Sequence, residues 1–301
     1  MFNKKFIQFL GVILILVFHL YSRISSSSLE TFIVSSAYIG VDLFFMCSAY
    51  SLSKKDHIEY ISFIKDRFRH IFIKFIIFAF IYSFLIYRPS YVYSAPLYLL
   101  CIDRFLSIVS GIEFIEKGGG AFLWFLSAIM IFYILYPLFI NWKNRYKTYI
   151  VFIGYIIIRL LLMYLNYDNL FILLDRVPLV LVTYIMVDKK IYIDWKYGFM
   201  MIVMGVLIMY VYRNTLNYLY GIPLCIGMAV LSRYVKENRI IDMIASASLE
   251  IYALQMMIGT DIYKLIYRFT GISFIINIIL FMVIIIMGIM INRVSEKILK
   301  I

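Results

Sequence analysis

The chain has 301 residues, of which 64% are hydrophobic and 15% are charged. Soluble domains average about 45–50% apolar and about 25% charged residues, so this composition excludes an ordinary soluble protein. The formal net charge of +12 is compatible with nucleic-acid binding, but the basic residues lie in short loops between apolar stretches, which favours membrane lipid and no nucleic acid as the partner.

Ten apolar stretches are long enough, or nearly so, to cross a bilayer as helices, and no polar stretch is long enough to form a separate soluble domain. We therefore predict an all-α, polytopic membrane helix bundle of about ten transmembrane helices, in which residues 1–301 form a single integral-membrane domain. The expected spans are residues 6–22, 32–53, 70–87, 121–141, 148–166, 170–187, 197–212, 216–232, 247–267 and 272–292.

The basic residues predict the orientation of these spans. If the N-terminus is cytoplasmic and the chain crosses ten times, a basic loop follows each even-numbered span, and most of the 29 Lys and Arg residues lie on the cytoplasmic side. The N-terminus and the C-terminus are then both cytoplasmic.

Two segments between the spans have a different character. Residues 54–72, KKDHIEYISFIKDRFRHIF, are basic and carry apolar residues at helical spacing, which predicts an amphipathic helix on the inner membrane surface. The same residues could meet a phosphate-bearing cytosolic ligand, with plain lipid contact as the alternative. Residues 91–115 are less apolar and predict an interfacial or re-entrant piece, although an eleventh crossing is also possible.

The polar residues inside the spans suggest a cavity. His19 lies near the outer end of the first span, and Arg176 lies near the outer end of the sixth. Polar groups in lipid usually face a protein interior or a water-filled cavity, so we expect the two to share an aqueous pocket in the outer half of the bundle. The alternatives are an interfacial or structural histidine, and an ion pair of Arg176 with the neighbouring Asp175.

Other polar residues have structural alternatives of the same kind. Asp42 near the middle of the second span is expected to hydrogen-bond between helices. Trp124, Tyr38, Tyr91 and Tyr93 could anchor at the membrane interface or, with a sugar substrate, stack on its rings. The three cysteines have no metal-ligand spacing, and no metal is expected. These residues alone fit a transporter as well as an enzyme.

Four stretches occur in a fixed order: ILILVFH ending at His19, GVDLFFMCSAYSLSKK starting at Gly40, LWFLSAIMIFYILYPLF starting at Leu123, and SLEIYALQ starting at Ser248. Together they resemble the integral-membrane acyltransferases of acyltransferase family 3, which transfer acetyl or other acyl groups to surface sugars and lipids. A fifth, weaker stretch is DRVPLVLVTY, which contains Arg176.

The resemblance implies an O-acetyltransferase in the bacterial plasma membrane. It would move an acetyl or other acyl group from cytosolic acetyl-CoA (acyl-CoA) to a hydroxyl of a surface or lipid-linked polysaccharide, such as a capsule glycan. His19 is the expected general base, and Arg176 or Ser127 would stabilise negative charge or position the sugar. The residues expected to bind the donor are Gln8, Arg67, Arg69 and Lys5, and those expected to bind the acceptor are Trp124, Asp42, Tyr133 and Gln255.

The chain departs from the family pattern at several positions. Gln8 stands where the family usually has Arg, Gln255 where it often has His, and His70 where a second Arg is common. Other cations, such as Lys5, Arg67 or Arg69, would have to bind the donor. Two alternatives remain. One is a transporter or flippase for polysaccharide or a lipid-linked sugar, which the departures at Gln8 and Gln255 favour, and the other is a non-catalytic subunit of a polysaccharide-assembly complex.

Overall fold

The computed structural model describes residues 2–21, 28–86, 97–211, 217–257 and 273–299. It is 86% helical, and the described residues contain no strand, which confirms the predicted all-α class. Within the described residues, seven helices are long and apolar enough to cross a membrane, or eight if the helices Arg239–Ser246 and Ser248–Met257, bent by 58° at their junction, form one span. Two shorter apolar helices, Trp195–Val211 and Leu219–Tyr234, coincide with two further expected spans. The number ten and the cytoplasmic termini stay predictions.

The chain divides into two compact units, each described here by itself. Unit 1 comprises residues 1–54 and 175–301, and unit 2 comprises residues 55–174. The helices of unit 1 are α1 (Lys4–Tyr21), α2 (Ser28–Ser36), the 3-10 turn η1 (Ala37–Ile39), α3 (Gly40–Ser53), α11 (Val177–Asp188), α12 (Trp195–Val211), α13 (Asn217–Leu231), the 3-10 turn η6 (Ser232–Tyr234), α14 (Arg239–Ser246), the helix Ser248–Met257 and α16 (Ser273–Leu299). Those of unit 2 are α4 (Tyr60–Arg67), the π-helical turn η2 (Phe68–Phe72), α5 (Ile73–Ile81), the π-helical turn η3 (Tyr82–Ile86), α6 (Leu97–Val109), α7 (Ile112–Lys117), the 3-10 turn η4 (Gly118–Gly120), α8 (Trp124–Asn141), α9 (Lys147–Tyr164), the 3-10 turn η5 (Asp168–Leu170) and α10 (Phe171–Leu174).

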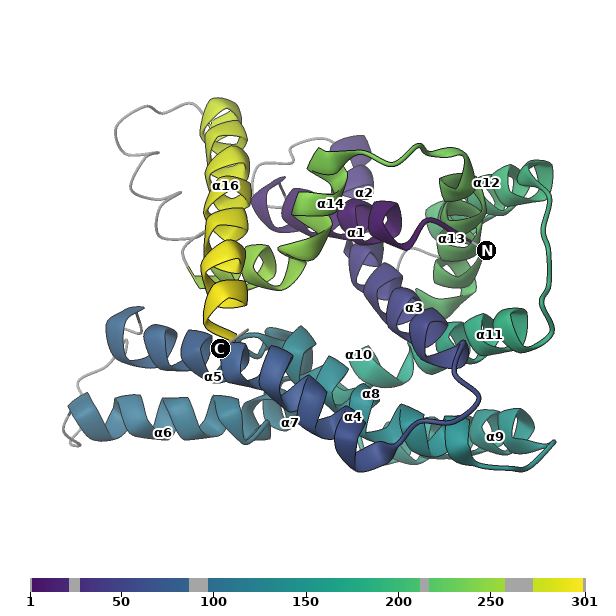
Figure 1. Ribbon diagram of the computed structural model, residues 1–301, viewed down its shortest axis with the longest axis horizontal. Coiled ribbons are helices and arrows are strands. Elements are labelled where there is room, and N and C mark those ends of the chain that lie inside the picture. The colour runs from purple at the N-terminus through teal and green to yellow at the C-terminus, as the bar shows by residue number, and fades with distance from the viewer. Residues whose placement is uncertain (1, 22–27, 87–96, 212–216, 258–272, 300–301) are drawn as a thin grey trace. The chain divides into compact units, whose positions relative to one another are not determined.

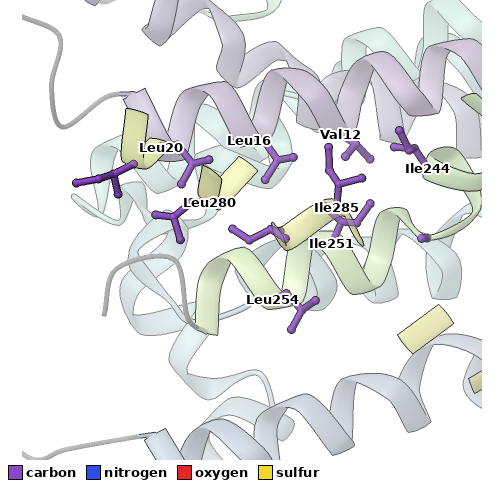
Figure 2. Packing of buried hydrophobic residues seen from close by; sticks show 11 residues of the cluster. Val12, Leu16, Leu20, Ile244, Ile251, Leu254, Leu280 and Ile285 are labelled. Carbon is purple, nitrogen blue, oxygen red and sulfur yellow. The ribbon is translucent and has the colours of Figure 1, made fainter. Parts of the chain in front are cut away.

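The core of unit 1 is built on one apolar face of α1. Val12, Leu16 and Leu20 recur every four residues, which places them on the same face of the helix. They form a buried cluster with Leu280 and Ile284 of α16 and with residues of the helix Ser248–Met257. Figure 2 shows side chains of this cluster between the helices, including Ile244, which α14 contributes. This packing fixes α1, which carries His19.

Glycines allow the helices of unit 1 to approach closely. A Cβ atom on Gly40 would lie 2.6 Å from the carbonyl oxygen of Gly11, so α1 and α3 meet at their backbones. On α12, a Cβ at Gly198 or Gly205 would collide with side chains of α13, and the two helices lie side by side (Figure 1). Small residues at such crossings are typical of membrane helix packing, where close van der Waals contact drives association.

Unit 2 contains one long helical segment instead of a separate surface helix. The helix runs from Tyr60 through two π-helical turns to Ile86, so the expected span 70–87 and part of the expected amphipathic segment form one continuous element. The expected interfacial piece forms α6 and α7, and α6 returns alongside α5 (Figure 1), where Phe105 contacts the rings of Phe80 and Phe84. The end of α8 is tied to the segment before α4, because the Asn141 amide exchanges two hydrogen bonds with the backbone of Ile58.

Substitution Gly40→Ala tests the backbone contact between α1 and α3. The new methyl group would overlap the Gly11 carbonyl and the Ile15 side chain, so we expect a loss of about 1–3 kcal/mol in the free energy of unfolding, as for other overpacked sites. The matched control is Gly154→Ala in α9, where an added Cβ meets nothing within 4 Å and better helix propensity should leave stability equal or slightly raised. Equal thermal midpoints for the two variants in detergent would contradict the close contact.

Candidate active site

His19 lies in the last turn of α1 and is half-buried. Its imidazole packs edge-on against the neighbouring ring of Phe18, with the ring centroids 5.1 Å apart. Phe18 in turn contacts the ring of Tyr38 in η1 at 5.3 Å. The apolar face of α1 that carries Leu16 and Leu20 is buried in the core of unit 1, so the helix presents His19 beside an aromatic pair from its own unit.

Arg176 lies where the expected sixth span is interrupted. It forms the N-cap position of α11, and Pro178 occupies the first turn, where a missing N–H costs no helical hydrogen bond. Its Nε lies 2.9 Å from Oδ1 of Asp42, and the two side chains are 2% and 10% exposed. The guanidinium carbon also lies 5.3 Å from the ring centre of Tyr38.

The structure thus brings three predicted site residues into one neighbourhood of unit 1. His19 contacts Phe18, and Phe18 contacts Tyr38. The guanidinium of Arg176 lies over the Tyr38 ring and pairs with Asp42. The pair joins α3 to the start of α11, which agrees with the expected interhelical hydrogen bond of Asp42. Sequence reasoning had considered Asp175 as the partner of Arg176, because only neighbours along the chain are visible there.

A second group of predicted residues lines a pocket in unit 2. The pocket has a volume of about 300 Å³ and is lined by Lys55, His57, Ile58, Glu59, Ser62, Phe63, Asp66 and Arg67. The guanidinium of Arg67 lies over two aromatic rings, 5.3 Å from the centre of Phe63 and 5.6 Å from that of Tyr133. Asp66 pairs with Arg67 at 3.1 Å and with His70 at 3.4 Å. The planar guanidinium of an arginine held in this way is suited to bind an oxyanion such as phosphate through two N–H donors.

The sequence was compared with known families once this geometry was defined. The acyltransferase family 3 model, described as an acyltransferase domain, matches residues 5–291. The chain belongs to acyltransferase family 3. A search of curated proteins and a search of solved structures found no match.

Membership of this family supports a multi-pass membrane acyltransferase, and the match extends over both compact units. The helices found in the structure agree with a membrane protein of this class.

The other residues predicted for the acyltransferase site are distributed over both units. On α1, the Lys5 ammonium donates to the Ser246 hydroxyl at 2.9 Å, and Gln8 is half-buried one turn later. In unit 2, Arg69 is exposed in η2, Trp124 is buried as the first residue of α8, and Ser127 is half-buried in the same helix. In unit 1, Gln255 is 5% exposed, and its amide has no hydrogen-bond partner within the described part of the chain.

Sequence reasoning missed the aromatic partners of the two arginines. Phe63 precedes Arg67 by four residues, a spacing that places both on one helical face, so this contact had a detectable signal. The contact of Tyr133 with Arg67 joins two distant segments, and the motif that contains Tyr133 had suggested acceptor binding instead. Tyr91 and Tyr93, also considered for sugar stacking, lie outside the described residues.

The buried pair Asp42–Arg176 can be tested by a double-mutant cycle with Asp42→Asn and Arg176→Gln. Each single change leaves the opposite charge buried without its ion-pair partner, which typically costs about 3–5 kcal/mol of unfolding free energy. The double variant should lose much less unfolding free energy than the two single variants together. Thermal or denaturant unfolding in detergent measures these losses. Strictly additive losses would show that the two side chains are not energetically coupled.

Proposed function

We propose that the protein is a membrane O-acyltransferase that moves an acetyl or other acyl group from cytosolic acyl-CoA to a hydroxyl of a surface or lipid-linked polysaccharide in the bacterial plasma membrane. The observation that carries this proposal is the family match over residues 5–291, combined with a half-buried imidazole, His19, that the rings of Phe18 and Tyr38 connect to a buried charge pair.

In the proposed reaction, neutral His19 accepts the proton of the acceptor hydroxyl. The hydroxyl oxygen attacks the thioester carbonyl, the new C–O bond forms, and the C–S bond breaks. The coenzyme A thiolate then takes up the proton from the imidazolium, which restores neutral His19. General base catalysis of this kind contributes typically about 10²–10⁴-fold to the rate.

Arg176 acts in this proposal as a positioning residue. Its side chain is 2% exposed and already pairs with Asp42, so much of its charge is neutralised before any substrate binds. It also lies over the ring of Tyr38, which contacts Phe18 beside His19. The burial of Arg176 supports a role in holding Tyr38 and the end of α1 in place, rather than the direct stabilisation of an oxyanion expected from the sequence. Ser127 remains the proposed hydrogen-bond donor to the negative charge that develops on the carbonyl oxygen.

The donor is proposed to place its phosphates at the pocket beside Arg67. Packing between Phe63 and Tyr133 restricts the guanidinium, so less conformational entropy is lost when its N–H groups bind an oxyanion. Lys55 adds a second cation to the same pocket, and the carboxylates of Asp66 and Glu59 balance the formal charge of the two cations. Arg69, Lys5 and Gln8 are the further proposed donor contacts, and Trp124, Asp42, Tyr133 and Gln255 the proposed acceptor contacts.

His19→Ala and His19→Asn test the proposed base. Neither replacement can take up a proton near neutral pH, so both should lower acyl transfer by about 10²-fold or more while the amount of folded protein stays the same. The measurement is incorporation of labelled acetyl from acetyl-CoA into surface polysaccharide by membranes that contain each variant. If wild-type membranes transfer no acyl group but move glycan across the bilayer, and His19→Ala does so equally well, the transport alternative replaces this proposal.

Arg67→Lys and Arg67→Ala test the donor pocket. Lysine keeps the charge but loses the planar fork and the stacking on Phe63 and Tyr133, so both variants should raise the KM for acetyl-CoA, with alanine the more severe. The increase should widen with ionic strength for lysine, because an exposed point charge is readily screened. Adding Arg69→Ala should weaken donor binding further, whereas an unchanged KM in Arg67→Ala would place the phosphates elsewhere.

A further inference from the structure

A buried carboxylate in unit 2 takes no part in the site described above. Glu113 lies on α7, and its side chain is 2% exposed. One oxygen, Oε1, receives three donors: Nη1 of Arg104 at 2.6 Å, Nζ of Lys117 at 3.4 Å, and the backbone N–H of Phe122 at 3.3 Å. These contacts tie α6, α7 and the segment before α8 together.

The second oxygen of this carboxylate is in a different situation. Oε2 is buried and, among the residues that the structure describes, it has no hydrogen-bond partner. A buried polar atom without a partner is costly, by about 1–3 kcal/mol and more for a charged group. All three donors point to one oxygen, so the other retains its capacity to accept a hydrogen bond from a ligand.

The two donors Arg104 and Phe122 bring aromatic rings close to this carboxylate. The guanidinium of Arg104 lies 5.6 Å from the ring centre of Tyr82, and Tyr82 stacks on Phe122 with the centroids 3.7 Å apart and the planes 12° apart. The following helix begins with Trp124, and Leu123 before it adopts a left-handed conformation with φ 55°. A carboxylate oxygen beside aromatic rings is suited to a ligand that has hydroxyl groups on an apolar ring face, as a pyranose does.

We propose that Glu113 binds the acceptor glycan, with Oε2 accepting a hydrogen bond from a sugar hydroxyl. This inference rests on the proposed function, because it names a residue that would hold the acceptor of that reaction. Arg104 and the backbone N–H of Phe122 hold the carboxylate in one orientation, whereas the contact of the half-exposed Lys117 is longer, at 3.4 Å. Glu113 is therefore placed in binding and not in proton transfer.

The test uses Glu113→Gln in the full-length protein reconstituted in lipid nanodiscs. Glutamine keeps the shape and one carbonyl acceptor for Arg104, but it replaces Oε2 by an N–H₂ group that donates instead of accepting. With labelled acetyl-CoA as donor and de-O-acetylated surface polysaccharide of the source cells as acceptor, the KM for polysaccharide should rise about tenfold or more, the usual size of a lost hydrogen bond to a charged group. The KM for acetyl-CoA should stay within about twofold.

The matched control is Lys117→Gln. It removes an ion pair to Oε1 but leaves Oε2 free to accept, so the KM for polysaccharide should stay near the wild-type value. An unchanged KM in Glu113→Gln, or an equal rise in both variants, would overturn the inference and assign Glu113 to structural support alone.

A binding measurement separates this inference from the proposed function. If the wild-type protein transfers no acyl group, equilibrium binding of labelled polysaccharide to nanodiscs still compares wild type with Glu113→Gln. Weaker binding by the variant supports the inference even when the enzymatic proposal has failed. Equal binding, or no binding by the wild type, overturns it.

Discussion

The arrangement of unit 1 depends on one buried ion pair, Arg176 with Asp42. Two charges that leave water lose several kcal/mol of solvation each, and only close geometry between them recovers that loss. The requirement fixes the start of α11 against α3, because a shift of either helix would leave a charge unpaired. Tyr38 and Phe18 pack on this fixed point, and His19 is positioned beside them. The reactivity proposed for the imidazole is therefore inseparable from a contact that involves no substrate.

The two arginines proposed for the acyltransferase show how burial separates their roles. Arg176 is buried, pairs with Asp42 and lies over the ring of Tyr38, so its charge already interacts with groups of the protein. Arg67 is about one-third exposed and lies over the rings of Phe63 and Tyr133 at the edge of a pocket, with Asp66 as a partner that solvent also reaches. Exposed ion pairs contribute little to stability, so Asp66 can be displaced by a ligand oxyanion at small cost. Arginine thus has a structural role in unit 1, at Arg176, and is a candidate ligand contact in unit 2, at Arg67.

Much of the fold could be predicted from the sequence, because the length and apolarity of a membrane helix are properties of a local window. The helical class and the approximate positions of the apolar helices found among the described residues follow from such windows. The family follows from short motifs in a fixed order. The partner of Arg176 could not be predicted, since Asp42 is distant in the chain and hydropathy gives no pairing between helices. The continuity of the helix from Tyr60 to Ile86 was also missed, because its polar first turns have the composition of a surface segment. The contacts of Glu113 could not be predicted either, because the sequence shows only that its segment is less apolar than the spans.

The backbone contact between Gly11 and Gly40 has a consequence for how substrates gain access. With no side chain between them, α1 and the start of α3 cannot slide or tilt independently without opening an empty gap. They behave as one rigid body that carries His19 and Asp42 together. A rearrangement that widens the approach to His19 is therefore expected in the neighbouring helices of unit 1 rather than in this pair.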